Sequence, residues 1–340
     1  MLAGTSSADP CDLVLSSGFL AFASHAGFLL AVEEAGLSVG GVMGTSAGAL
    51  TGALYCAGYT PRQVAKHLSE NTPATLLRPS LTPWRGGALS LEGVVARLRD
   101  LLPPRFEDLS REFAVGVVTA DGRHLLIDSG PLPEAVAASA AIPFVFQAVD
   151  VPGRSRHGPF KDGGVVDRVG LKAWRDRRRV QMKHHVFNGS ASPRPPTCLV
   201  HVIERSSPFS GSDDMTATGE SHILVVKSPR SGANFFDLGA FDDTMSLAAE
   251  RATSQLHRLR TRRGSSSGGN GSSSSSSGGA QAPGVASASV NGAAALANGL
   301  AVNGAGAHVS GLAVNGAVYN GLAVAAIEGS EEPIIHATLL

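Results

Sequence analysis

The chain has 340 residues, of which 43% are hydrophobic, and its 28 basic and 28 acidic residues cancel to a formal net charge of zero. This length permits two domains, but the uneven composition favours one large folded domain. Every basic residue precedes 264, whereas three acidic residues follow it, so residues 1–263 carry 28 basic against 25 acidic side chains, a charge of +3. So small an excess does not indicate nucleic-acid binding.

Cysteine content and hydropathy bear on the compartment. The three cysteines, Cys11, Cys56 and Cys198, are odd in number and far apart, which disfavours a disulfide framework or a zinc site and favours a reducing environment. The sequence shows neither an apolar run of signal-peptide type nor an apolar span of about 18 residues. We therefore expect a cytoplasmic protein, compatible with peripheral membrane association. A plastid location is the alternative if the N-terminus is incomplete.

Hydrophobic periodicity alternates between strand and helix after a short N-terminal extension, residues 1–11. The expected elements are, in chain order, a strand at 12–16, a helix at about 24–35, a strand at 40–43, a helix at 47–56, helices at 61–68 and 91–102, strands at 113–119 and 124–127, a helix at 132–141, a strand leading to 161, and strands at 199–203 and 223–226. This alternation predicts an α/β domain at 12–263 with three layers, α/β/α, around a largely parallel sheet.

Residues 264–340 differ in composition from the rest of the chain. Segment 264–279 consists of nine serines, six glycines and one asparagine, and 264–327 has no formally charged residue. Gly-Leu-Ala-Val recurs at 299–302, 311–314 and 321–324, each near an Asn-Gly turn signal, so weak hairpins or a small solenoid are one interpretation. We expect a disordered, low-complexity tail instead, because alanine and glycine offer little surface to pack.

A serine stands between two glycines in Gly44-Thr45-Ser46-Ala47-Gly48. Residues 39–43 can form a short buried strand before it, and the alanine-rich 47–56 can open a helix after it. Such a turn exposes the serine oxygen at the positive end of a helix, and Gly44 and Gly48 let backbones cross closely. An ordinary strand-to-helix turn is the alternative, but these flanks favour the nucleophile elbow of an acyl-transfer enzyme.

A serine nucleophile requires a base for its proton and N–H donors for the oxyanion. In an ordinary α/β-hydrolase the base is a histidine, but that fold places several strands before its nucleophile, and only one strand precedes the serine strand here. Five histidines that follow Asp162 are considered as the base, and none of them stands in a recognisable loop motif: His184, His185, His201, His222, His257. We interpret His201 as a strand residue and His257 as part of a solvated helix face.

Asp162 is the better candidate base. It follows a predicted strand, and Gly163-Gly164 can bring its carboxylate close to another backbone. An aspartate with an unperturbed pKa of about 3.9 is a poor base near neutrality, so burial must raise its pKa or the contact with the serine must be very direct. A tight Asp-Gly turn is the alternative interpretation.

These residues resemble the patatin-like phospholipase family, whose members use a Ser-Asp dyad on an α/β/α fold. The resemblance covers about 12–171 and rests on four motifs in the family's order: the serine motif at 44–50, Ala57-Gly58-Tyr59, the segment 138–143 with Phe146, and Asp162-Gly163-Gly164. It implies Ser46 as nucleophile and Asp162 as activating base, with the Ala47 N–H beside the nucleophile and no metal or cofactor. In such enzymes the serine attacks a lipid ester, an acyl-enzyme forms, and water releases the fatty acid.

The chain departs from the family in its oxyanion loop. Family members carry a glycine-rich loop with a basic residue after the first strand, but here only Gly18 remains, Phe19 and Phe22 stand at glycine positions, and Ala21 stands at the basic position. If the turn requires positive φ at Phe19, this residue costs on the order of 1 to 2 kcal/mol. Loss of one oxyanion donor typically lowers the rate by about 100- to 1000-fold, so slow hydrolysis stays compatible with the sequence.

A second departure follows the aspartate motif. Arg168 and Gly170 replace the family's asparagine and proline, and a basic insert follows at 174–179. We interpret the insert as a solvated helix face, with a membrane-surface patch anchored by Trp174 as the alternative. Four apolar residues of an earlier loop are interpreted as capping the core, with a lipid entrance as the alternative: Leu76, Leu77, Leu81, Trp84.

The sequence therefore predicts a lipid acyl hydrolase of the phospholipase A or galactolipase type, with a role in lipid degradation. Its substrate surface is a membrane or lipid droplet, contacted transiently, and the sequence indicates neither nucleic acid nor a protein partner. A catalytically weak or silent lipid- or acyl-binding relative is the first alternative. A general esterase with a Ser-His-Asp triad is the second.

Overall fold

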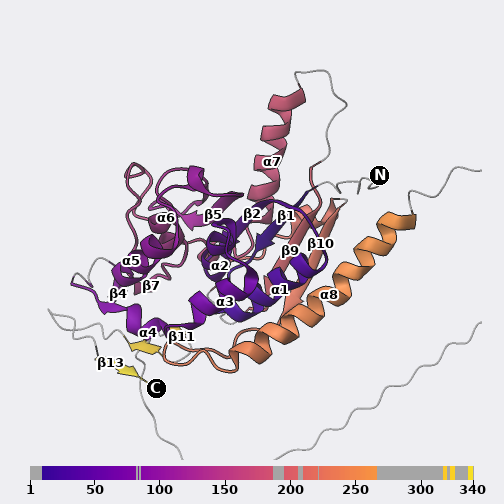
Figure 1. Ribbon diagram of the computed structural model, residues 1–340. Helices are drawn as coiled ribbons and strands as arrows, with labels where there is room; N and C mark the ends of the chain where they lie inside the picture. The colour runs from indigo at the N-terminus through magenta and orange to yellow at the C-terminus, as the bar shows by residue number, and fades with distance from the viewer. Residues whose placement is uncertain are drawn as a thin grey trace, which may run out of the picture.

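The computed structural model describes residues 10–81, 83, 86–186, 195–205, 210–220, 222–265, 317–319, 322–325 and 336–339. Strands and helices alternate along the main domain, and helices lie on both sides of a central sheet (Figure 1). This arrangement confirms the expected three-layer α/β/α fold with a largely parallel sheet.

The central sheet has seven strands in the order β10-β9-β1-β2-β5-β6, with β8 also pairing with β5. Their bounds are β1 Cys11–Leu15, β2 Val39–Thr45, β5 Glu112–Val118, β6 His124–Ile127, β8 Lys161–Asp162, β9 Cys198–Ile203 and β10 Ile223–Ser228. Neighbours from β10 to β5 are parallel, whereas β6 and β8 run antiparallel to β5. The C-terminal ends of the parallel strands β1, β2 and β5 therefore lie at the same end of the sheet. β8 also lies at this end.

Both faces of the sheet are buried because side chains alternate along each strand. Leu13 and Leu15 belong to a core shared with α1, α2, α6 and α8, whereas Val14 belongs to a second core that includes Trp174 of α7. The helices of the domain are α1 Phe22–Glu34, α2 Ala47–Cys56, α3 Pro61–Ser69, α5 Glu92–Leu101, α6 Leu132–Ser139, α7 Leu171–Val186 and α8 Phe241–Ser265. Short 3-10 helices lie at Phe106–Asp108, Gly163–Val165 and Thr216–Gly219.

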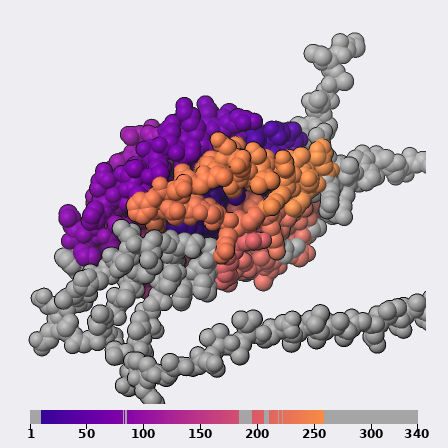
Figure 2. Space-filling model, turned by 90° about the horizontal axis from the view of Figure 1, so that it is seen from below, coloured from indigo at the N-terminus to yellow at the C-terminus, as the bar shows by residue number. Residues whose placement is uncertain are grey.

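The long helix α8 lies across α1 and covers one face of the domain (Figure 2). Gly27 allows the two helices to approach closely, since a Cβ at this position would lie 2.1 Å from the carbonyl oxygen of Met245. The N- and C-terminal parts of the domain are thereby packed against each other.

A small second sheet forms where the sequence predicts a proline-rich loop. It contains β3 Arg78–Pro79, β4 Gly87–Ser90 and β7 Phe144–Phe146, and the one-turn helix α4 Pro73–Leu76 precedes it. β3 and β4 have only two and four residues, too few for period-2 alternation to be read from the sequence.

Three short strands are described in the C-terminal tail: β11 Ala317–Tyr319, β12 Leu322–Ala325 and β13 His336–Leu339. They pair antiparallel, with Tyr319 opposite Leu322 across the Asn-Gly dipeptide. The pairing of these short strands is what the hairpin interpretation expects. The other predictions for 266–340 lie outside the described residues.

Helix α7 carries the basic insert, and its position corrects both interpretations of that segment. Trp174 and Arg175 are fully buried, and Trp174 donates a hydrogen bond from Nε1 to Oδ2 of Asp12 at 3.0 Å. The guanidinium of Arg178 lies over the Trp174 ring, 4.5 Å from its centroid. Trp174 therefore anchors the helix to the protein's own sheet rather than to a membrane surface.

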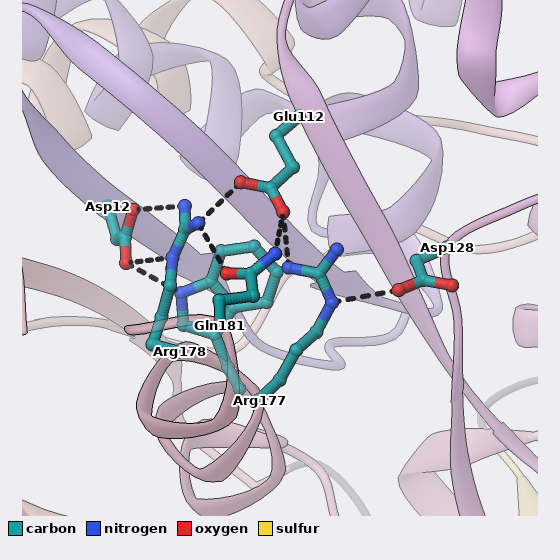
Figure 3. Close-up of polar contacts among 7 residues, drawn as sticks. Asp12, Glu112, Asp128, Arg177, Arg178 and Gln181 are labelled. Carbon is teal, nitrogen blue, oxygen red and sulfur yellow. Dashed lines mark hydrogen bonds and ion pairs between the residues drawn. The ribbon is translucent and has the colours of Figure 1, made fainter. Parts of the chain in front are cut away.

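An ion-pair network attaches the same helix to the strands (Figure 3). Arg178 pairs with the fully buried Asp12 at 2.7 Å and with Glu112, and Arg177 pairs with Glu112 and, at 2.8 Å, with Asp128. These charges neutralise one another beneath α7, which explains why arginines face the sheet. Among the described residues of the insert, Arg179 is the most exposed arginine, with 44% of its side chain accessible.

Candidate active site

Ser46 occupies a strained turn between β2 and α2. Its φ of +55° is unusual for a residue with a side chain, and it separates the last residue of β2 from the first residue of α2. A Cβ at Gly44 would lie 2.4 Å from the carbonyl oxygen of Gly48, and a Cβ at Gly48 would lie 2.2 Å from that of Leu15. Both glycines are therefore required by close backbone approach, and the turn has the shape of a nucleophile elbow.

The hydroxyl of Ser139 supports this turn from α6. It accepts a hydrogen bond from the Ser46 N–H at 2.9 Å and donates one to the carbonyl oxygen of Gly116 at 2.6 Å. Ser139 is fully buried, so its hydroxyl connects the strained serine to β5 without water. The sequence placed this serine in a motif but gave no sign of its role.

The structure brings Ser46 and Asp162 together. The Ser46 hydroxyl donates a hydrogen bond to Oδ2 of Asp162 at 2.7 Å. The other carboxylate oxygen, Oδ1, accepts the Gly164 N–H at 2.7 Å, and the Asp162 N–H is bonded to the carbonyl oxygen of Ala141. Because a Cβ at Gly163 would lie 2.5 Å from the carbonyl oxygen of Gly116, the aspartate loop can approach β5 only with glycine there.

Burial makes Asp162 a stronger base than an ordinary aspartate. Loss of solvent raises its pKa from 3.8 to about 6, while the bonds from Ser46 and Gly164 and the charge of Arg168 act in the opposite direction. The carboxylate is thus both buried and in direct contact with the serine hydroxyl, the two conditions that a catalytic aspartate requires near neutrality.

No histidine in the described part of the chain hydrogen-bonds to Ser46. His201 lies in β9, fully buried, with its Nδ1 2.9 Å from Nδ1 of His25 and its Nε2 2.9 Å from the hydroxyl of Ser228. His222 and His257 are exposed. The side chains of His184 and His185 lie outside the described residues.

The candidate oxyanion loop follows β1 and faces the same space as Ser46. Phe19 and Leu20 line the cavity that Ser46 and Ala47 also line. The positive φ lies at Leu20 (+49°) rather than at Phe19, the position considered from the sequence. Within the described residues, the N–H groups of Phe19, Leu20 and Ala47 have no hydrogen-bond acceptor in the protein.

Arg168 and Gly170 are both explained by their surroundings. Gly170 has a φ of +69°, which proline cannot adopt, and its N–H donates to Oδ1 of Asp167 at 3.0 Å. The guanidinium of Arg168 is buried and donates to the carbonyl oxygens of Ser17 and Ile203. The aspartate loop is therefore supported by contacts other than those that an asparagine and a proline would make.

An apolar cavity of about 130 Å³ opens at Ser46. Ala47, Leu50 and Leu54 line it from one face of α2, so it follows this helix for about 10 Å at 1.5 Å per residue. The opposite wall comes from α5 and the loops around the small sheet, with Leu91, Val94, Leu98, Leu101, Ile142, Phe146 and Phe235. The shape and lining suit a single hydrocarbon chain.

The four apolar loop residues that the sequence offered as a core cap or a lipid entrance have different outcomes in the structure. Leu76 and Leu77 line this cavity, as a lipid entrance requires. Leu81 is 91% exposed, which excludes a core-capping role for that residue, and Trp84 lies outside the described residues. The sequence analysis missed three polar residues of the cavity wall, His67, Asn71 and Arg97, because they stand on α3, just after it and on α5, outside any motif.

The described residues contain no group of three or more His, Cys, Asp or Glu side chains arranged to hold a metal ion. Among them, no helix is long and apolar enough to cross a membrane.

Comparisons with known proteins relate the N-terminal half of the chain to one family. Residues 13–173 match the family model for patatin-like phospholipase. Uncharacterised NTE family proteins of Mycobacterium bovis and Mycobacterium tuberculosis are 33% identical to the chain over 166 residues, which cover 48% of this chain and 44% of each relative. The chain thus spans less than half the length of these relatives.

Two solved structures are similar at low sequence identity. VipD from Legionella pneumophila is 12% identical with a TM-score of 0.45, covering 75% of this chain and 67% of that one. ExoU in its complex with SpcU, from the type III secretion system of Pseudomonas aeruginosa, is 15% identical with a TM-score of 0.39, covering 73% of this chain and 51% of that one. We conclude that residues 13–173 of the chain form a region that matches the patatin-like phospholipase family.

Proposed function

We propose that this protein hydrolyses fatty acyl esters of membrane lipids through Ser46 and Asp162. The observation that carries the proposal is the 2.7 Å hydrogen bond from the Ser46 hydroxyl to a buried carboxylate at the mouth of an apolar cavity. The substrate class, a phospholipid or galactolipid, follows from the family and from the apolar lining together.

The reaction begins with proton transfer from the Ser46 hydroxyl to Oδ2 of Asp162. The serine oxygen forms a bond to the ester carbonyl carbon, and the carbonyl electrons move to its oxygen. This tetrahedral intermediate collapses by breaking the bond to the alcohol portion of the lipid, which takes the proton from Asp162 as it leaves. The fatty acyl group then remains on Ser46 as an ester.

Water completes the cycle. Asp162, again ionised, accepts a proton from a water molecule whose oxygen attacks the acyl carbon. The second tetrahedral intermediate collapses, the serine oxygen recovers the proton, and the fatty acid is released. Both intermediates place negative charge beside Ala47 and the Phe19-Leu20 turn, whose N–H groups have no acceptor within the described protein.

The apolar cavity explains the preference for a lipid. A fatty acyl chain with its carbonyl at Ser46 runs along α2 toward Leu54 and removes apolar surface from water at about 25 cal/mol per Å². Most of the wall is aliphatic or aromatic, so a charged or strongly polar acid portion would be disfavoured there.

One observation favours the weaker alternative, a lipid-binding relative with little activity. Phe19 and Phe22 stand at glycine positions of the family's oxyanion loop, and Leu20 adopts a positive φ that is unfavourable for a residue with a side chain. If this turn relaxes in solution and its N–H groups turn away, the protein would bind acyl chains and hydrolyse them slowly.

Labelling with a fluorophosphonate and hydrolysis of a lipid panel test the proposal. We expect the wild type to be labelled at Ser46 and to release fatty acid, and we expect S46A and D162N to lose both properties. Equal labelling of wild type and D162N would contradict the dyad. Binding of fatty acid to an unlabelled, inactive wild type would support the lipid-binding alternative, whereas loss of activity on substitution of His201 or His257 would support a histidine base.

A further inference from the structure

Arg168 is a buried arginine that the proposed reaction does not use. Only 3% of its side chain is accessible, and its guanidinium donates to Asp213 at 2.7 Å, to the Ile203 carbonyl oxygen at 2.7 Å and to the Ser17 carbonyl oxygen at 3.1 Å. A buried guanidinium that satisfies two backbone carbonyls fixes the segments to which they belong, because its donors form a rigid planar fork.

Arg168 forms hydrogen bonds with both backbone polar groups of Ser17. Its N–H donates to the Arg168 carbonyl oxygen at 2.6 Å, and its own carbonyl oxygen accepts from the Arg168 side chain. The next three residues, 18–20, form the candidate oxyanion turn. The orientation of the first peptide of that turn is therefore set by a residue of the aspartate loop, 151 positions later in the chain.

The surrounding contacts show that the attachment is tight. A Cβ at Gly18 would lie 2.8 Å from the Ile203 side chain, so the turn rests directly on the residue whose carbonyl Arg168 also binds. A Cβ at Gly164 would lie 2.5 Å from the Ser17 hydroxyl oxygen, and the Gly164 N–H bonds to Asp162. Ser17 therefore lies between the oxyanion turn and the loop that carries the base.

We propose that Arg168 is a positioning residue for catalysis: its guanidinium holds the Gly18-Phe19-Leu20 turn in place relative to Asp162. This role rests on the proposed function of Ser46 and Asp162. It explains how a turn that lacks a glycine run, and that has Ala21 where the family has a basic residue, keeps N–H groups available beside the nucleophile. The positive charge near this turn is supplied by Arg168 of the aspartate loop instead of by a basic residue at position 21.

The test compares R168M and R168K with R175M as the matched control. Arg175 is also buried and donates to one carboxylate, Glu220, and to one carbonyl oxygen, that of Pro196, but it has no contact with residues 16–20. All three variants are measured for kcat, KM, the rate of fluorophosphonate labelling at Ser46, the pH profile and thermal stability.

We expect R168M to lower kcat and the labelling rate by on the order of 100-fold, the effect of a misplaced oxyanion donor, with KM unchanged because Arg168 does not line the acyl cavity. The acidic limb of the pH–activity profile of R168M moves to higher pH. The charge of Arg168 lowers the pKa of Asp162, so its removal raises that pKa. R168K retains that charge without the fork, so it keeps the pH profile and recovers part of kcat. R175M loses stability and keeps kcat.

The outcomes separate this inference from the proposed function. If R168M and R168K fold and retain the wild-type kcat and labelling rate, Arg168 is structural only and the inference is wrong. If R168M fails to fold, R168K decides: a lower kcat at unchanged KM supports the role, and an unchanged kcat contradicts it. A wild type that neither hydrolyses lipid nor is labelled at Ser46 contradicts the proposed function itself, and the role of Arg168 with it.

Discussion

The Ser46 hydroxyl donates a hydrogen bond to Oδ2 of Asp162 at 2.7 Å, although the two residues are 116 positions apart. One lies in the turn after a parallel strand, β2, and the other on β8, which runs antiparallel to β5. β2 and β8 pair with the same edge of β5, β2 with residues 112–116 and β8 with the next two, 117–118, so pairing with β5 places the base directly beyond the end of the nucleophile's strand. Activity should therefore depend on contacts around β5 as well as on the two residues themselves.

The first prediction concerns the pH dependence of hydrolysis. The pKa of Asp162 is raised to about 6, and only the ionised carboxylate can accept the serine proton. We expect kcat/KM to increase about tenfold per pH unit below this value and to level off above it. The measurement is kcat/KM on a soluble ester, and a profile that is flat between about pH 5 and 8 would contradict the assignment of Asp162 as base.

The second prediction concerns Ser139. S139A leaves the Ser46 N–H and one lone pair of Gly116 without a partner in a buried region, which we expect to cost about 1 to 3 kcal/mol of unfolding free energy. The strained turn at Ser46 also loses its support, so kcat should decrease. T119A, which removes a buried hydroxyl from the β5–β6 turn, is the control and should keep kcat. Equal kcat in wild type and S139A would show that the turn needs no such support.

The third prediction concerns acyl chain length. Leu54 lines the cavity from α2, eight residues and about two helical turns beyond Ser46, so L54F should narrow the space there and L54A should widen it. We expect L54F to lower kcat/KM for palmitate esters while sparing butyrate esters, and L54A to shift the preference toward longer chains. A series of p-nitrophenyl esters measures this. If both variants keep the wild-type chain-length profile, the acyl chain does not occupy this cavity.

The fourth prediction concerns acid stability. His25 is buried, its Nε2 lies 2.9 Å from the Ser16 carbonyl oxygen, and burial lowers its pKa from 6.5 to about 4. The folded state thus favours the neutral imidazole, so its contribution is present above pH 6.5 and is lost as the pH falls toward 4. The loss for one histidine is about 3 kcal/mol at 1.36 kcal/mol per pKa unit.

Denaturant unfolding of wild type and H25Q across this pH range provides the measurement. H25Q should be less stable than wild type at pH 7, and the difference should shrink as the pH decreases, because the variant has no imidazole to protonate at this position. H222Q, which changes an exposed histidine, is the control. Parallel stability curves for wild type and H25Q would rule out the buried neutral histidine as the cause.

The fifth prediction concerns the network beneath α7. R178M leaves the carboxylate of Asp12 fully buried without its cation, and breaking such a pair typically costs about 3 to 5 kcal/mol. R179M changes an exposed neighbour of the same helix and should cost less than about 1 kcal/mol. Unfolding free energies of the two variants test this difference. Similar values for both would mean that the network contributes little.

The fold could be predicted from local patterns because most elements carry their own signal. The buried runs that became β1, β2 and β5 and the glycine-bounded turn at Ser46 depend on neighbouring residues, which a sequence displays directly. The small sheet could not be predicted, since β3 and β4 are too short for a period. Its strands form because β7, from a distant part of the chain, pairs with β4.

The basic insert shows why its own position could not be predicted from the sequence. An arginine-rich helix is typical of a solvated face, and the sequence could not indicate that Asp12 and Glu112 lie opposite Arg178 in space. The same limit applies to Arg168: its replacement of a family asparagine was visible, but its contact with Ser17 depends on how β1 and the aspartate loop meet.

The sequence by itself determined the resemblance to a family, the α/β/α architecture and the two residues from which a reaction can be proposed, because each motif is a local requirement of backbone geometry. The tertiary structure decided which residues surround that pair: Ser139 behind the nucleophile, Arg168 beside the turn after β1 and Leu54 in the cavity wall. Burial that raises the pKa of Asp162 likewise exists only when distant segments exclude water together.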